Sequence, residues 1–164
     1  MYSRIVVPLD GSDIAEQALA SAEELARAAG ATLHLVRIVE FLSTSYTYVY
    51  SAMIEGEALA MQLEDQTRLA EEYLTEVARS IAEHGVVVST ESRHGIAAQE
   101  LIAIMQPGDL FVIASHGRSG VARWFLGSVA EEITRHATVP VLLVRAGSPA
   151  ATRRVPHAPT ALTA

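Results

Sequence analysis

The sequence contains neither cysteine nor lysine, and each absence removes a group of functions. Without cysteine, the 164-residue chain has no disulfide, no thiolate zinc site and no thiol nucleophile. All twelve basic residues are arginine, so a lysine Schiff base and the lysine of a Walker-type phosphate loop are both excluded.

Aromatic residues and long apolar runs are also scarce. Aromatic residues make up 5% of a chain that is 50% hydrophobic, so we expect an aliphatic core. No run of 18 apolar residues is present, and the first residues lack the basic and apolar segments of a signal peptide, so we expect a soluble cytoplasmic protein. The net charge of −7 and the pI of about 5.3 argue against a general binder of nucleic acid or acidic membranes.

Apolar runs that alternate with helical patterns predict an α/β fold. Strands are expected at 5–9, 32–39, 86–90, 109–113 and 139–144, and helices at 13–29, 57–84, 97–105 and 128–136. Helical crossovers between successive strands predict one doubly wound domain over residues 1–146, a five-stranded parallel sheet of order 3-2-1-4-5 with helices on both faces. Segment 41–56 lacks clear periodicity and is predicted to be a long loop. The proline-containing tail, 147–164, is predicted to be disordered.

A loop rich in small residues follows the fourth predicted strand and precedes the last helix. It begins Ala114-Ser-His-Gly117-Arg-Ser-Gly120 and ends at Gly127-Ser128-Val129. Between a strand and a helix, such a loop leaves backbone N–H groups pointing into a crevice, where the helix dipole also attracts phosphate. A tight turn alone would equally account for the glycines.

The predicted strand order brings this loop next to Asp10-Gly11, which ends the first strand. Ligands of doubly wound sheets bind where the winding reverses, between strands one and four, so the convergence favours a nucleotide. Asp10 could accept hydrogen bonds from a ribose or help to hold a magnesium ion, or it could be only a turn residue before Gly11. Ser128 could bind phosphate, or it could cap the helix through the capping box Ser128-x-x-Glu131.

Other side chains expected near this crevice are Leu9, Val39, His116, Arg118 and Arg123. The two apolar residues could form walls for an adenine ring, whereas the histidine and the arginines could meet phosphate oxygens or remain solvated. Catalysis has little support, because the helical zinc motif and the five-residue hydrolase elbow are both absent. We therefore rank binding above turnover, with at most slow ATP hydrolysis.

Four blocks of the sequence, in this order and spacing, resemble the universal stress protein family. They are Ile5-Val-Val-Pro-Leu-Asp10-Gly-Ser12, Ser115-His-Gly-Arg-Ser-Gly120, Leu126-Gly-Ser-Val-Ala130 and Pro140-Val-Leu-Leu-Val144. The resemblance covers about residues 2–146 and implies the ATP-binding branch. Its motif G-x2-G-x9-G-[S/T] falls on Ala114, Gly117, Gly127 and Ser128, with alanine in place of the first glycine. Alanine is the mildest replacement, so we expect binding to survive.

The resemblance also implies roles for individual residues. Adenine and ribose would contact Pro8, Leu9, Asp10 and Val39; the phosphates would contact Gly117, Gly127, Ser128 and Val129; and Gly120 would shape the loop. It implies a homodimer through strand 139–144, which would otherwise be an uncovered apolar sheet edge.

The implied role is that of a nucleotide sensor or signalling module in the stress response. Alternatives are a nucleotide-independent interaction or chaperone-like module, an ATP-using enzyme such as an adenylyl transferase, or a receptor for another adenine nucleotide such as cyclic AMP. Replacing Gly127 by aspartate is predicted to abolish nucleotide binding, because a carboxylate there would repel phosphate.

Overall fold

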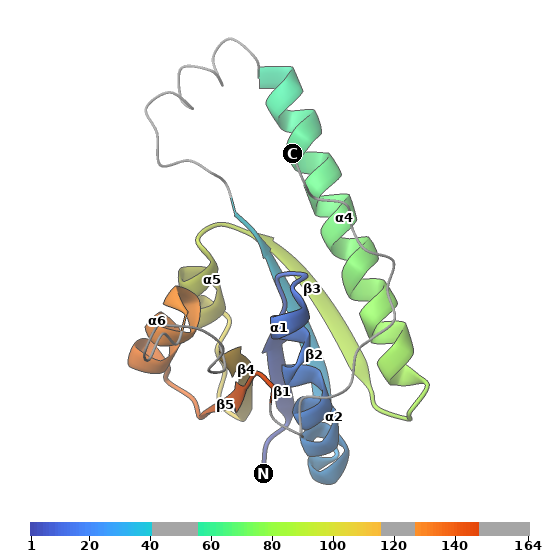
Figure 1. The fold of residues 1–164 in the computed structure, drawn as a ribbon, viewed down its shortest axis with the longest axis vertical. Coiled ribbons are helices and arrows are strands. Elements are labelled where there is room, and N and C mark those ends of the chain that lie inside the picture. Colours follow the sequence, from blue (N-terminus) through green and yellow to red (C-terminus); the bar gives the residue numbers. More distant parts are fainter. Residues whose placement is uncertain (41–55, 116–126, 148–164) are drawn as a thin grey trace.

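A single parallel sheet forms the centre of the molecule in the computed structural model, which describes residues 1–40, 56–115 and 127–147 (Figure 1). Its strands are β1 (Arg4–Pro8), β2 (Thr32–Val39), β3 (Val88–His94), β4 (Asp109–Ser115) and β5 (Val141–Arg145). They lie in the order β3-β2-β1-β4-β5, and every neighbouring pair is parallel. The predicted strand number and order are confirmed.

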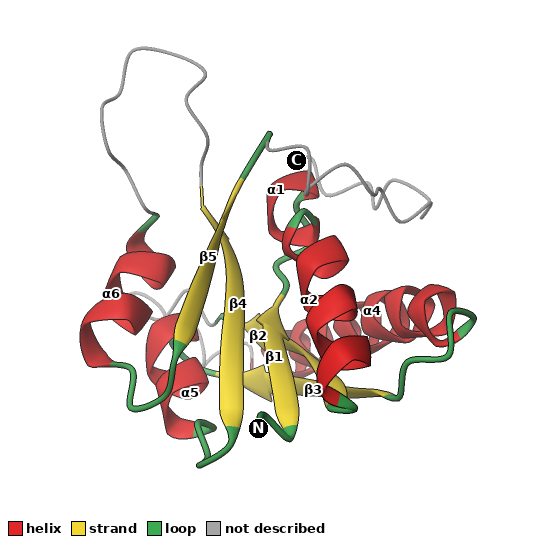
Figure 2. Cartoon of the chain, turned by 90° about the horizontal axis from the view of Figure 1, so that it is seen from below, coloured by secondary structure: helices red, strands yellow, loops and turns green. Residues whose placement is uncertain are grey.

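The helices cover both faces of this sheet, as the doubly wound prediction requires. They are α1 (Asp13–Glu16), α2 (Ala18–Ala29), α4 (Gly56–Ala82), α5 (Ala97–Ala103) and α6 (Ser128–His136). Figure 2 shows α5 and α6 on one side of the strands and α1, α2 and α4 on the other. No helix in the described ranges is long and apolar enough to cross a membrane.

Two elements differ from their predicted extents. The helix expected over 13–29 is interrupted at Gln17, whose N–H donates to the carbonyl of Ile14 in a tighter turn that separates α1 from α2. The strand expected at 86–90 runs instead over Val88–His94. As an edge strand with no fully buried residue it tolerates polar side chains, so the apolar run was a poor guide to its end. The predicted loop at 41–56 and the tail beyond 147 lie outside the described residues, apart from Gly56, which begins α4.

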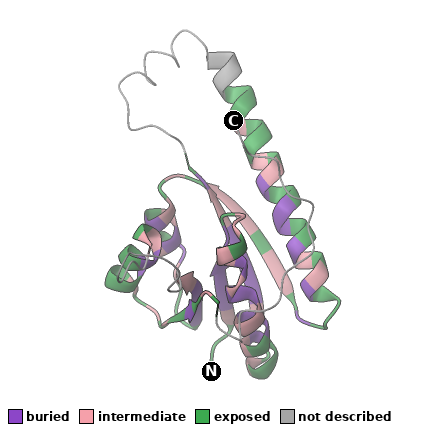
Figure 3. Ribbon diagram, viewed as in Figure 1, coloured by how far each residue is buried: buried purple, intermediate pink, exposed green. Residues whose placement is uncertain are grey.

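Alternate residues of the strands feed two apolar clusters, one on each face of the sheet (Figure 3). One lies between the sheet and helices α2 and α4 and contains Val7, Leu35 and Val77. The other lies between the sheet and helices α5 and α6 and contains Phe111 and Ile133. Apart from Tyr73 and Phe111, the buried members of both clusters are aliphatic, which confirms the expected core. This packing holds β1 and β4 side by side within the sheet, with their carboxyl ends at the same edge.

Candidate functional site

The ends of β1 and β4 meet at one edge of the sheet. The two strands pair in parallel, with Arg4 opposite Asp109 and Val6 opposite Phe111, so their carboxyl ends point the same way. The chain leaves β1 through Leu9 and Asp10 and leaves β4 after Ser115. The adjacency of strands one and four, on which the predicted site depends, is therefore confirmed.

Asp10 lies in a turn between β1 and α1 that its own side chain organises. The N–H of Ser12 donates to Asp10 Oδ1 at 2.8 Å, and Ser12 Oγ accepts from the N–H of Ala15 at 3.1 Å as the N-cap of α1. The predicted turn role of Asp10 is thus confirmed. Its side chain is nevertheless exposed, and Oδ2 accepts no hydrogen bond from the described part of the chain. This oxygen is available to a ligand hydroxyl.

The start of α6 offers backbone donors and a free hydroxyl. Gly127 is the N-cap, with φ of 79° and ψ of 138°, and its carbonyl accepts the N–H of Glu131 at 2.9 Å. Ser128 is the first helical residue, so the capping-box alternative is wrong: the cap position belongs to a glycine without a side chain. Within the described ranges the exposed Ser128 hydroxyl makes no hydrogen bond, and the first N–H groups of α6 have no helical partner.

The predicted apolar contacts are arranged along the same edge. Leu9 and Val39 are 3% and 6% exposed, so both side chains belong to the core beside this edge. Pro8 pairs with Val36, and therefore Val39 lies three residues further along β2 than the end of β1. Val129 is half-buried and packs against the α5–α6 cluster.

Ala114 occupies the first position of the glycine motif. It lies within β4, paired with Val144 in extended backbone, so its methyl group introduces no backbone strain. The remaining predicted ligand residues, His116, Gly117, Arg118 and Gly120, lie outside the described residues, as does Arg123.

The sequence analysis missed a polar cluster directly beneath the Asp10-Gly11 turn. The guanidinium carbon of Arg37, on β2, lies 5.0 Å from the ring centroid of Tyr73, on α4. The hydroxyl of Tyr73 donates to Oε1 of the buried Glu16 at 2.9 Å. Burial, together with the Glu16 carboxylate, raises the pKa of Tyr73 far above its usual value and keeps the phenol neutral. The available signal in the sequence was the charged residue Arg37 within the mostly apolar strand 32–39.

A second polar cluster, centred on His34, lies on the face of β2 and β3 that packs against α5 and α6. Nδ1 of His34 lies 2.8 Å from Ser89 Oγ, and Nε2 lies 3.0 Å from Oε2 of Glu91. Burial lowers the pKa of His34 despite the neighbouring carboxylate, which favours the neutral ring at pH 7. Arg93 holds the other oxygen of Glu91 at 2.9 Å. We interpret this chain of contacts as a structural link between the two strands.

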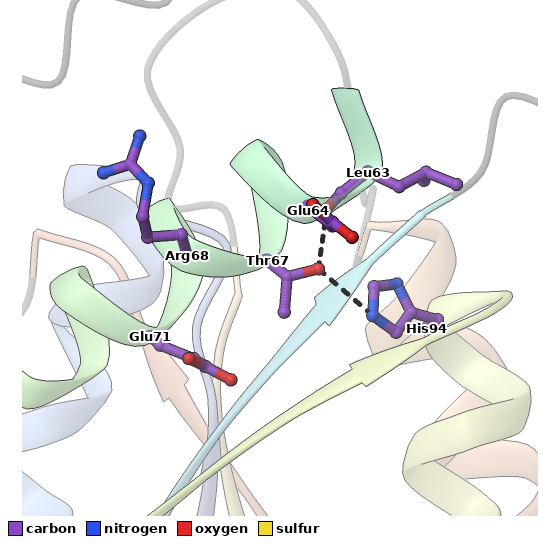
Figure 4. A pocket seen from close by; sticks show the side chains of 6 residues that line it. All are labelled: Leu63, Glu64, Thr67, Arg68, Glu71 and His94. Atoms are coloured by element: carbon purple, nitrogen blue, oxygen red, sulfur yellow. Dashed lines mark hydrogen bonds between the residues drawn. The ribbon is translucent and has the colours of Figure 1, made fainter. Parts of the chain in front are cut away.

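A groove opens beyond the end of β3, between that strand and α4 (Figure 4). Its volume is about 440 Å³, and it is lined by Leu63, Glu64, Thr67, Arg68, Glu71 and His94. Thr67 Oγ1 donates to the carbonyl of Leu63 at 2.7 Å and lies 3.2 Å from Nε2 of His94. None of the predicted ligand residues lines this groove, and its two carboxylates disfavour a phosphate. In the described ranges no group of three or more His, Cys, Asp or Glu residues could hold a metal ion.

Known proteins share both the sequence pattern and the fold. The family model described as the universal stress protein family matches residues 1–145. Universal stress protein MJ0531 of Methanocaldococcus jannaschii is 31% identical over 147 residues, which cover 88% of this chain and 83% of that protein. The structure of universal stress protein UspA from Lactobacillus plantarum superposes with a TM-score of 0.71 at 24% identity, covering 88% of this chain and 98% of that one.

Two further similar structures are described as nucleotide complexes. One is a universal stress protein in complex with cAMP, with a TM-score of 0.61 at 22% identity and coverage of 88% and 97% of the two chains. The other, from Archaeoglobus fulgidus, is in complex with dAMP, with a TM-score of 0.55 at 19% identity and coverage of 87% and 97%. The match to the family model over nearly all of the described domain, with the matching strand order, establishes the relationship: the chain belongs to the universal stress protein family.

Proposed function

We propose that this protein binds an adenine nucleotide, with ATP as the first candidate, and acts as a cytoplasmic nucleotide sensor or signalling module in the stress response. The observation that supports it most directly is the juxtaposition of β1 and β4. The Asp10 turn leaves β1 at the carboxyl ends of the strands, which is where α/β folds bind their ligands. The next helix along the chain after β4 is α6. Within the described ranges the hydroxyl of Ser128 and the N–H groups of the first helical turn have no partner, which suits a phosphate.

Each end of the nucleotide has a distinct set of proposed contacts. Pro8, Leu9 and Val39 would enclose the adenine, and Oδ2 of Asp10 would accept from a ribose hydroxyl. Gly127, Ser128 and Val129 would hold the phosphates, together with Gly117 and with Arg118 and His116 nearby. If magnesium accompanies the nucleotide, Asp10 is its proposed protein ligand.

The similar structures with cAMP and dAMP support adenine as the base, and they keep cyclic AMP as an alternative ligand. A nucleotide-independent dimeric interaction or chaperone-like module is the other alternative, and the missing first glycine of the motif favours it. That argument is weakened by the extended conformation of Ala114, because alanine has no backbone penalty there. We propose that hydrolysis is slow or absent, because the sequence contains neither the helical zinc motif nor the five-residue hydrolase elbow.

Native mass spectrometry of freshly purified protein tests this proposal. We expect a mass increase of one adenine nucleotide per chain, and calorimetry with ATP, AMP, cAMP and GTP should show that the adenine compounds bind at least tenfold more tightly than GTP. If no nucleotide co-purifies and no adenine compound binds at millimolar concentration, the nucleotide-independent module becomes the better description.

We also propose that the protein forms a homodimer through β5. Leu142 and Leu143 remain 38% and 36% exposed on this edge strand, and an uncovered apolar edge promotes association. Replacing Leu142 by glutamate should convert the dimer to a monomer in sedimentation velocity. The control is Val87→Glu, which charges an exposed apolar residue beside the other edge strand and should leave the dimer intact. A monomeric wild type, or a dimer that survives Leu142→Glu, would contradict this arrangement.

A further inference from the structure

Arg37 stands apart from the other arginines of the described residues. Arg4, Arg27, Arg68, Arg93 and Arg135 each form an ion pair with a carboxylate. Arg79 and Arg145 have no such partner but are exposed, whereas Arg37 is half-buried and still lacks a carboxylate within 4.0 Å in the described ranges. No described side-chain nitrogen is both fully buried and unsatisfied, so the guanidinium donors of Arg37 reach solvent. Its place is therefore set by packing.

The packing partners of Arg37 are an aromatic ring and a glycine. The guanidinium lies over the ring of Tyr73 at 5.0 Å, within the range of a cation–π contact. A Cβ built on Gly11 would lie 3.3 Å from Nη1, 3.5 Å from Nη2 and 3.6 Å from Cζ. The guanidinium therefore occupies the space that a side chain at position 11 would need, and the φ of +85° at Gly11 also favours glycine.

The helix that follows the same turn is held by the same tyrosine. The hydroxyl of Tyr73 bonds to Glu16 in α1, the helix that follows the turn, and Glu16 is 3% exposed. Arg37 thus lies against Gly11 in the segment between β1 and α1, and Tyr73 holds the last residue of α1, the helix that follows this segment. Asp10 lies directly before Gly11 in the chain. The position of the Asp10 carboxylate therefore depends on how far the Arg37 side chain holds the Gly11 backbone from the sheet.

Arg37 is on the wrong face of the sheet to hold the phosphates proposed at α6. Arg37 shares a face of β2 with Leu33 and Leu35, because alternate residues of a strand point the same way. Both leucines belong to the cluster that packs against α2 and α4, whereas α6 packs on the opposite cluster. The geometry points to an indirect role: we propose that Arg37 is a positioning residue that supports Gly11 and sets the Asp10 carboxylate at the height needed to bind a ribose hydroxyl. This inference rests on the proposed nucleotide site.

The test separates the ribose contact from the rest of the nucleotide. Calorimetry compares ATP with 2′,3′-dideoxy-ATP for the wild type, Arg37→Met and Asp10→Asn; methionine keeps an apolar stem on Tyr73. We expect the wild type to prefer ATP by about tenfold, which corresponds to ~1.4 kcal/mol. Both variants should reduce this preference to below twofold while binding the dideoxy compound as the wild type does. The double variant should show no further loss, because both changes remove one interaction.

The matched control is Arg79→Met, which removes an exposed arginine of α4 that has no carboxylate partner. It should leave the ribose preference unchanged. An Arg37→Met variant that keeps the tenfold preference, or that weakens ATP and dideoxy-ATP equally, would overturn the positioning role.

Hydrogen exchange tests the support of the turn by Arg37 without any nucleotide. The amide of Ser12 is protected by Asp10 Oδ1, so its hydrogen exchange reports the geometry of the turn. Exchange at Ser12 should accelerate at least tenfold in Arg37→Met and stay unchanged in Arg79→Met. If the wild type bound no nucleotide, the proposed function would fail, and unaltered Ser12 exchange in Arg37→Met would show separately that Arg37 does not support the turn.

Discussion

Replacing Ser128 by aspartate should weaken nucleotide binding at least 100-fold without destabilising the fold. Ser128 is exposed and occupies the first position of α6, where a carboxylate interacts favourably with the helix dipole by about 0.3–1 kcal/mol. The same carboxylate would repel a bound phosphate, and two unit charges about 4 Å apart near a protein surface interact by about 4 kcal/mol. A 100-fold loss requires only ~2.7 kcal/mol of this repulsion.

Calorimetry and thermal unfolding of one variant set measure both effects. The control is Ser128→Asn, which has nearly the same shape but no charge and should lose no more than tenfold in affinity. The unfolding temperature of Ser128→Asp in the absence of nucleotide should equal or slightly exceed that of the wild type. Unchanged ATP affinity in Ser128→Asp would place the phosphates elsewhere.

This substitution is a cleaner test than the Gly127→Asp change suggested by the sequence. At Gly127 the backbone has φ of 79° and ψ of 138°, a conformation that residues other than glycine rarely adopt. Any replacement there would introduce strain of about 1–3 kcal/mol, so a loss of binding could not be assigned to charge alone. Ser128 has ordinary helical geometry and avoids this difficulty.

The strand order was predictable because each of the strands β1, β2 and β4 carried a largely apolar run, and most strands were followed by residues with a clear helical period. The runs at β1, β2 and β4 came from residues that are now buried on both faces, such as Val6 and Val7. β3 was misplaced because an edge strand with polar alternation lacks that signal. The family motifs then marked the turn after β1 and the start of α6, which are local features of the sequence.

The cluster under the Asp10 turn could not be predicted in the same way. Arg37, Tyr73 and Glu16 come from β2, α4 and α1, and their contact depends on how α4 crosses the sheet. A helical period identifies the buried face of α4 but not which strand residue lies opposite Tyr73. The role of Ser128 was also undecided by sequence, because the sequence does not show whether the helix starts at Ser128 or one residue later. Only the later start would make Ser128 the N-cap of a capping box.

The adjacency of β1 and β4 is fixed at the opposite edge of the sheet by one ion pair. Arg4 donates from Nε to Asp109 Oδ1 at 2.9 Å and from Nη2 to Oδ2 at 2.7 Å. A further hydrogen bond runs from Nη2 to the carbonyl of Ile104 at 2.8 Å. The two charged residues stand directly opposite each other in the strand register, and Asp109 is 2% exposed. The pairing that brings the site together is therefore specified partly by charge.

The protonation of Asp109 links this pair to the pH dependence of stability. Burial alone would raise the pKa of Asp109, but the hydrogen bonds from Arg4 and from the Gln106 amide outweigh it and hold the pKa below its usual value of 3.8. A carboxyl whose pKa is lower in the folded state stabilises the fold above its unfolded pKa. That contribution is lost as the pH falls through the folded pKa.

Replacing Arg4 by methionine should lower the free energy of unfolding by about 3 kcal/mol at pH 7, because it leaves the buried carboxylate of Asp109 without its cation. Urea unfolding at a series of pH values measures this cost. The pKa of Asp109 should rise above 3.8 once Arg4 is gone. The difference between wild type and variant should therefore begin to shrink as the pH falls through that raised pKa, and should go on shrinking until the pH passes the lowered pKa of the wild type. Arg4→Met combined with Asp109→Asn should recover part of the loss at pH 7, since it removes the unpaired charge. A cost of Arg4→Met that stayed constant from pH 7 to pH 3 would show that Arg4 acts through packing alone, and that charge does not select β4 as the neighbour of β1.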